Sequence, residues 1–247
     1  MFIESNTHTK KDYEILRELE NYYNCSPGSH VEKIRNFTKY IRSQDIAHFL
    51  ARYEIFKKIM NVQGSIIECG VLHGAGLMSF AHFSAIFEPI SHSRKIIGFD
   101  TFAGFPELTK EDEKSISEFA KKGEFAADSY ADLQRCISLY DAHRYISHIP
   151  KVELIRGDVV ETIPKYIEDN PQLMVSLLYL DMDLYKPTKV ALENFIPRMP
   201  KGAVIAFDEL YSKHFPGETK ALLDTIGIRD LQIEKFSFTN YKSYVVL

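Results

Sequence analysis

The 247-residue chain is predicted to form an α/β domain with a mostly parallel sheet and an antiparallel strand at its C-terminus. From Ser65 onward, short apolar runs rich in β-branched residues alternate with segments of helical periodicity. Strands separated by helices are joined by crossover connections, which produce a parallel sheet. Near the C-terminus, two strand-like runs are separated only by a short turn around 239–242, which is the pattern of a hairpin.

The elements divide the chain into two predicted parts. Residues 1–60 are expected to be a helical extension, because apolar residues recur there at spacings of three and four, with a break at 24–30. Residues 61–247 are expected to form the α/β domain. The predicted strands are SIIECG (65–70), KIIGFD (95–100), VELIR (152–156), MVSLLYLD (174–181), GAVIAFD (202–208), LQIEKFSF (231–238) and SYVVL (243–247). The predicted helices between them are 75–88, 161–169, 187–196 and 218–226.

Composition and charge exclude several classes of protein. The net charge is −4 and the basic residues are scattered, so a nucleic-acid partner is not expected. The most apolar helical segment, about 77–90, is too short to span a bilayer, so no membrane partner is expected. The first residues lack the order of a secretory signal. A cytoplasmic location is therefore expected.

One long segment, 106–130, has no regular pattern and lies between the second and third predicted strands. Loops of this length inside a compact domain are commonly lids or binding elements. A solvated surface helix is the competing interpretation, and the sequence favours neither.

Candidate ligand-binding residues follow the strands, because ligands of open parallel sheets bind beyond the carboxyl ends of the strands. The first strand ends in Glu68, followed by a turn with glycines at 70, 74 and 76. Such a turn lets the backbone approach a ligand before the next helix begins. Glu68, an acid at the tip of a buried strand, is placed to meet an ammonium group. Close packing of helix and strand is the alternative reason for Gly74 and Gly76.

The second and third strands end in acids that suit a nucleoside. Asp100 is at the position where related folds hold a ribose through its hydroxyls. Asp158 follows the third strand and could reach an adenine amino group, or it could only cap the helix that begins near Val160.

The fourth and fifth strands end in four carboxylates: Asp181, Asp183, Asp208 and Glu209. These strands are expected to be neighbours, so the acids would repel one another without a compensating charge. Mg²⁺ prefers such hard oxygen ligands, whereas zinc would favour histidine or cysteine. Each acid alone could instead be a helix cap or an ion-pair partner.

Four stretches together resemble the macrocin O-methyltransferase (TylF-like) family of S-adenosyl-L-methionine (SAM)-dependent enzymes. They are ECGVLHGAG, GFDTFAGFP, GDVVETIP and LYLDMDLYKPTKVALENFIPRMPKGAVIAFDEL, and they cover about residues 65–225. The resemblance implies the seven-stranded, Rossmann-like fold of class I SAM methyltransferases. It also implies Mg²⁺-dependent methylation of sugar hydroxyls, with SAM and Mg²⁺ as cofactors, and a homo-oligomer.

The resemblance assigns roles by position. Asp181, Asp208 and Glu209 are implied metal ligands, and Asp183 is the implied general base. The implied SAM contacts are Glu68, Gly70, Val71, Gly74, Asp100, Thr101 and Asp158. His214 is a rival base, because its unperturbed pKa of about 6.5 suits the task, or it is a plain surface histidine.

The sequence departs from the family pattern at three positions. Leu72 and His73 stand where the family commonly has tryptophan and arginine, and Glu209 stands where it has aspartate. The acceptor therefore stays open: a sugar or sugar nucleotide is expected, and a non-sugar natural-product hydroxyl is the alternative. A non-catalytic sugar-binding member of the fold is a third hypothesis. A nicotinamide-dependent oxidoreductase would share Asp100 and the glycine turn but would not explain Glu68 or the four acids.

Overall fold

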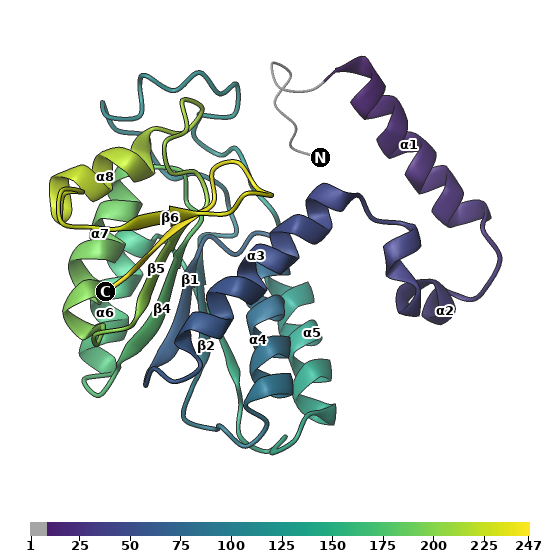
Figure 1. Ribbon diagram of the computed structural model, residues 1–247, viewed down its shortest axis with the longest axis horizontal. Helices are drawn as coiled ribbons and strands as arrows, with labels where there is room; N and C mark the ends of the chain where they lie inside the picture. The colour runs from purple at the N-terminus through teal and green to yellow at the C-terminus, as the bar shows by residue number, and fades with distance from the viewer. Residues whose placement is uncertain (1–8) are drawn as a thin grey trace.

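A single seven-stranded sheet forms the centre of the protein in a computed structural model, which describes residues 9–247 (Figure 1). The strand order is β3-β2-β1-β4-β5-β7-β6. The strands are β1 Ser65–Cys69, β2 Ile96–Asp100, β3 Val152–Arg156, β4 Val175–Leu180, β5 Val204–Phe207, β6 Ile233–Lys235 and β7 Ser243–Val246. Neighbours among the first five strands are parallel, and β7 is antiparallel to both β5 and β6. The predicted fold class is confirmed, including the antiparallel strand at the C-terminus.

Helices cover both faces of the sheet (Figure 1). One face carries α3 Ser43–Ile59, α4 Ala75–Phe87 and α5 Tyr130–His143, and the other carries α6 Val159–Asp169, α7 Tyr185–Phe195 and α8 Gly217–Thr225. Each face has its own buried apolar cluster, because successive side chains of a strand point to opposite faces. In β1, Ile66 belongs to the first cluster and Ile67 to the second. The parallel strands are thus buried on both faces, as their continuous apolar runs predict.

The helices of the first 60 residues differ in how far they join the core. Helix α1 (Lys10–Cys25) has no buried residue, and with α2 (His30–Arg35) it projects away from the sheet (Figure 1). A short 3₁₀ helix, η1 (Phe37–Lys39), follows. Helix α3 buries Ala51, Ile55, Phe56 and Ile59 in the core. The last helix of the predicted extension is therefore part of the packed domain.

Residues 106–129 form turns and coil without a regular helix, and α5 follows them. The sequence patterns did not predict α5. The described residues also include η2 (Ile196–Arg198) after α7. None of the helices in the described range combines the length and hydropathy needed to cross a lipid bilayer.

Candidate active site

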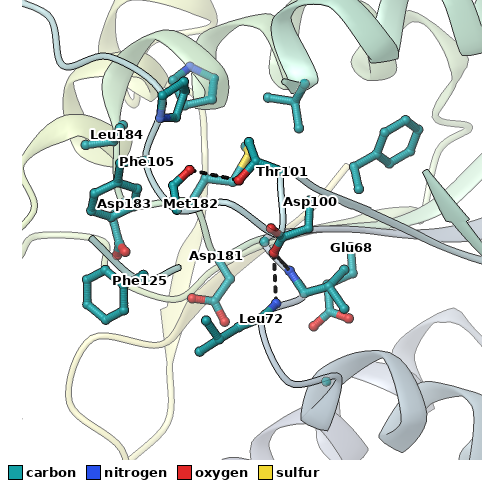
Figure 2. A pocket seen from close by; sticks show the side chains of 18 of the residues that line it. Glu68, Leu72, Asp100, Thr101, Phe105, Phe125, Asp181, Met182, Asp183 and Leu184 are labelled. Atoms are coloured by element: carbon teal, nitrogen blue, oxygen red, sulfur yellow. Dashed lines mark hydrogen bonds between the residues drawn. The ribbon is translucent and has the colours of Figure 1, made fainter. Parts of the chain in front are cut away.

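A cavity of about 340 Å³ lies beyond the carboxyl ends of the parallel strands (Figure 2). This is the place where open parallel sheets bind their ligands, and the volume is within the range of small-molecule sites. Eight of the predicted site residues line it: Glu68, Gly70, Val71, Asp100, Thr101, Asp158, Asp181 and Asp183. Four others do not: Gly74, Asp208, Glu209 and His214.

The turn after β1 is shaped by glycines in the left-handed region of backbone space. Gly70 has φ 91°, and a Cβ there would overlap the main chain of Asp181 at the end of β4. Gly74 has φ 82°, and a Cβ there would overlap the side chain of Leu133 in α5. Gly74 therefore permits close contact with helix α5, not the helix–strand packing considered from the sequence, and its predicted contact with the cofactor stays a prediction. Gly70 lets the turn pass directly beside β4.

Asp100 holds this turn through main-chain hydrogen bonds. Its Oδ2 accepts from the N–H groups of Val71 at 2.7 Å and Leu72 at 2.8 Å, and its Oδ1 accepts from Phe102 N–H at 2.7 Å (Figure 2). A carboxylate offers about four acceptor positions, so capacity for a ribose hydroxyl remains. Asp100 thus fixes the loops after β1 and β2 before any ligand binds.

Thr101 and Asp158 also have local structural partners. The Thr101 hydroxyl donates to Gly104 O at 2.8 Å and accepts from Ala103 N–H at 3.1 Å. Asp158 caps α6, because its Oδ1 accepts from Val160 N–H at 2.9 Å. The capping interpretation of Asp158 is confirmed. Since both residues also line the cavity, their predicted contacts with a nucleoside stay open as predictions.

Glu68 is the most deeply buried acid of the cavity wall. It is 1% exposed, and its Oε2 has no hydrogen-bond partner among the residues described. Burial raises the pKa of Glu68 to about 8; the charge of Arg52 is the largest cause that opposes this rise, and the charges of Asp181 and Asp100 add to it. A buried carboxyl without a partner destabilises the fold, so this position is suited to a cationic ligand group.

Asp181 and Asp183 both line the cavity, and both come after the last residue of strand β4. Strand β4 ends at Leu180, so the two-residue alternation of a strand does not continue to Asp183. Asp183 has φ 64°, a left-handed conformation that is uncommon for a non-glycine residue and is found repeatedly at functional sites. Burial raises the pKa of Asp181, and the charges of Lys242 and Arg52 oppose that rise.

Asp208 faces a buried ammonium group. Its Oδ1 accepts from the Tyr179 hydroxyl at 2.8 Å and forms an ion pair with Lys242. The two side chains of this ion pair are 15% and 4% exposed. Burial lowers the pKa of Lys242 to about 8, while Asp181 and Asp183 favour its charged form. The ammonium group of Lys242 thus interacts with Asp181, Asp183 and Asp208, three of the four acids that the sequence predicted to lie together.

The backbone of Glu209 contacts a buried acid, Glu218 of α8. The N–H of Glu209 donates to Glu218 Oε2 at 3.1 Å, while Glu218 Oε1 has no hydrogen-bond partner in the described range. Burial raises the pKa of Glu218 well above its ordinary value, and the Asp183 carboxylate is the next cause. Burial and the neighbouring Asp183 carboxylate thus both favour the protonated form of Glu218.

The segment 106–129 is fixed beside the acids rather than free. Asp112 is 3% exposed, and its Oδ1 accepts from Tyr185 N–H at 2.9 Å, two residues after Asp183. The Ser115 hydroxyl donates to the main-chain oxygen of His214, the alternative general base, so this hydrogen bond anchors the segment 106–129. Phe105 and Phe125 flank the cavity on the side of Asp183 (Figure 2).

The sequence patterns missed two basic residues of this site, Arg52 and Lys242. Arg52 lines the cavity and shares a helix face with Ile55, Phe56 and Ile59, each no more than 1% exposed. The sequence did contain a signal for Arg52: it lies three, four and seven residues before the apolar residues of one helix face. Lys242, in the turn before β7, had none, because its contact with Asp208 is made only when β7 pairs with β5.

The acids do not fit Mg²⁺ as they are arranged. In the described residues, no group of three or more histidine, cysteine, aspartate or glutamate side chains is placed to hold a metal ion. Asp208 is occupied by the Lys242 ammonium, which already supplies the compensating positive charge. A divalent cation at Asp208 would require this ammonium to leave.

The cavity does fit SAM. A buried acid with an unpartnered oxygen suits a cationic amino-acid group, and a fixed strand-end acid on β2 suits a ribose. With the seven-stranded sheet and its reversed β7, these features define a SAM-dependent methyltransferase of class I.

The chain belongs to the macrocin-O-methyltransferase (TylF) family, whose model matches residues 43–221, and it is a SAM-dependent O-methyltransferase. The resemblance drawn from its motifs is confirmed. A crystal structure of CalS11, a calicheamicin methyltransferase, is 30% identical, with 97% of this chain and 93% of that chain covered and a TM-score of 0.92.

Two further structures are similar. The apo structure of CalS11, described as a TDP-rhamnose 3'-O-methyltransferase of calicheamicin biosynthesis, is 29% identical, with 97% and 95% of the two chains covered and a TM-score of 0.83. The O-methyltransferase NovP is 18% identical, with 81% and 78% covered and a TM-score of 0.63, and shares the fold. No match was found among curated protein sequences.

Proposed function

We propose that this enzyme transfers the methyl group of SAM to a hydroxyl of a sugar or sugar nucleotide, with Asp183 as the general base. The observation that carries the proposal is the position of Asp183, in a left-handed conformation on the wall of the cavity that Glu68 and Asp100 also line. The similarity to CalS11, a TDP-rhamnose methyltransferase, supports the sugar. The aromatic side chains of Phe105 and Phe125 beside Asp183 support it too, because they can cover a sugar ring and exclude water.

The chemistry needs one proton acceptor and a fixed geometry. When bound, SAM supplies an electrophilic methyl group on a sulfonium. Asp183 takes the proton of the acceptor hydroxyl as its oxygen bonds to the methyl carbon and the carbon–sulfur bond breaks. Glu68 would hold the amino-acid part of the cofactor and Asp100 its ribose, while Phe105 and Phe125 would shield the acceptor hydroxyl from water. The products are a methyl ether and S-adenosylhomocysteine, and Asp183 then releases its proton to solvent.

Magnesium dependence stays a prediction of the sequence, and no step above passes through a metal. If Asp181, Asp208 and Glu209 bind Mg²⁺ during turnover, EDTA abolishes the reaction and Mg²⁺ restores it. If Lys242 keeps its ion pair with Asp208, turnover continues in EDTA. The rate with and without chelator decides between the two. The cytoplasmic location and the homo-oligomer also stay predictions, as does a lid function for 106–130.

An acceptor screen tests the proposal. Purified enzyme is incubated with methyl-labelled SAM and a panel of nucleoside diphosphate sugars, free sugars and catechols, each with Mg²⁺ or EDTA. The expected result is label transfer to a sugar-containing acceptor, located by mass spectrometry and NMR. Label transfer only to catechols or other non-sugar hydroxyls would contradict the sugar assignment but keep the O-methyltransferase.

A further inference from the structure

One acidic and one basic side chain of the cavity wall each have a buried polar atom without a partner. They are Glu68, with its Oε2, and Arg52, with its Nε. Such atoms are rare in the residues described here, where only four side chains have one. Leaving a buried polar group unpaired costs about 1–3 kcal/mol, and more if it is charged. A ligand that pairs with both would recover this free energy.

Arg52 and Glu68 are close but not joined. In the sheet, Glu68 on β1 is the direct neighbour of Tyr179 on β4, and the Arg52 guanidinium lies 5.8 Å from the centre of the Tyr179 ring. Arg52 is the first of the charges that lower the pKa of Glu68 against the effect of burial. Yet no ion pair within 4.0 Å joins these two side chains in the described structure. Both side chains line the same cavity, so a ligand bound there lies beside each of them.

The glycine turn holds Glu68 in place for such a ligand. A Cβ at Gly76, in the first turn of α4, would overlap Glu68 Oε1. The backbone of α4 therefore packs directly against this carboxylate and leaves Oε2 for a partner from the cavity. Arg52 is fixed by its helix, whose stripe of Ile55, Phe56 and Ile59 is buried in the core.

We propose that Arg52 binds the α-carboxylate of the methionine part of SAM while Glu68 accepts hydrogen bonds from its α-ammonium. The two residues then recognise the amino-acid zwitterion as a unit, and a residue of the N-terminal helices becomes part of the cofactor site. A guanidinium suits this task, because it donates to both oxygens of a carboxylate in a fixed geometry. The inference rests on the proposed function only in that SAM is the methyl donor.

Calorimetric binding to three ligands tests the pairing. The ligands are S-adenosylhomocysteine, its decarboxylated analogue and 5'-methylthioadenosine, which lacks the amino-acid part. In Arg52→Met, the Kd of S-adenosylhomocysteine is expected to rise about 10- to 150-fold, the loss of one charged hydrogen-bond pair. The Kd of the other two ligands should not change, because neither has a carboxylate. Arg52→Lys should recover part of the loss.

Arg42→Met is the matched control. Arg42 precedes the same helix and pairs with Asp45 at 3.0 Å, but it does not line the cavity, so all three affinities should equal those of the wild type. Equal weakening of all three ligands by both Arg52→Met and Arg52→Lys would mean a structural role and overturn the proposal. Unchanged affinities with a raised KM for the acceptor would place Arg52 in the acceptor site and also overturn it. Failure of the wild type to bind any of the three would instead defeat the SAM assignment itself.

Discussion

The two sides of the cavity use strand-end carboxylates in opposite ways. One side, which we call the cofactor half, contains Glu68, Leu72, Asp100 and Thr101, which lie at or just after the ends of β1 and β2 (Figure 2). There, Asp100 accepts hydrogen bonds from main-chain N–H groups, and Glu68 is left with an unpartnered oxygen. The cofactor half is thus shaped by its own hydrogen bonds, and one carboxyl oxygen is left for a ligand.

On the other side, the acceptor half contains Asp183, Leu184, Phe105 and Phe125 (Figure 2). Behind it, an ammonium group from the last hairpin neutralises Asp208. The four acids after β4 and β5 therefore do not act as one cluster: Asp208 is paired, while Asp183 stands on the cavity wall. An acid at a strand end becomes a ligand, a base or an ion-pair partner according to the group that faces it.

The largest effect is expected from the acceptor half. Asp183→Asn should lower kcat by about 10²- to 10⁴-fold, because the amide cannot take the proton of the acceptor hydroxyl. S-Adenosylhomocysteine should still bind with wild-type affinity, because the cofactor half is unchanged. Asp169→Asn, at the exposed end of α6, is the control and should leave kcat as it is. Full activity in Asp183→Asn would show that Asp183 is not the general base, and His214 would then be the next residue to test.

Breaking the Lys242–Asp208 pair should mainly affect stability. Lys242→Met leaves Asp208 as a buried charge with a hydroxyl partner only, which should lower the free energy of unfolding by about 3–5 kcal/mol. Urea denaturation in EDTA measures this, and Lys242→Met/Asp208→Asn should recover part of the loss. Lys235→Met on the exposed edge strand should change stability by less than about 0.5 kcal/mol.

The Lys242→Met variant also tests whether Mg²⁺ can bind at Asp208. If Mg²⁺ can take the place of the ammonium, adding it to Lys242→Met should restore part of the stability, whereas the wild type should not respond. A wild-type protein that gains stability in Mg²⁺ would show that the ion displaces Lys242, and the arrangement described here would then be only the metal-free one.

A smaller effect, on the pH dependence of stability, is expected from Glu68 in the cofactor half. Its folded-state pKa of about 8 lies above the ordinary value of 4.5, so the folded protein keeps a proton that the unfolded chain releases between these values. The free energy of unfolding should therefore fall as pH rises through this window. Glu68→Gln should weaken that slope and stabilise the ligand-free protein at about pH 8, while reducing affinity for S-adenosylhomocysteine.

Urea titrations of wild type and Glu68→Gln at about pH 5.5 and about pH 8 check this prediction. Glu218 contributes in the same direction, so the slope should decrease rather than vanish. Identical slopes in the two proteins would mean that Glu68 is not protonated in the folded state. A variant that is both more stable and a weaker binder would identify Glu68 as a residue kept for ligand binding at the expense of stability.

The sequence by itself determined the sheet and the rim of acids. Apolar runs and helical periodicity are local, so they predicted the strands, most of the crossover helices and the C-terminal hairpin. Because parallel strands end at the same edge, they also placed Glu68, Asp100, Asp158, Asp181 and Asp183 around one cavity. Helix α5 was missed although Tyr130, Leu133, Ile137 and Tyr140 recur at helical spacings of three and four, because it begins directly after the long irregular segment.

Only the tertiary structure decided which group faces each acid. Lys242 reaches Asp208 through the pairing of β7 with β5, and Arg52 comes beside Glu68 through the packing of α3 into the core. Both contacts join residues far apart in the chain, and neither is encoded in local spacing. The charge state of a buried carboxylate depends on such neighbours and on the loss of water, which exist only after the chain has folded.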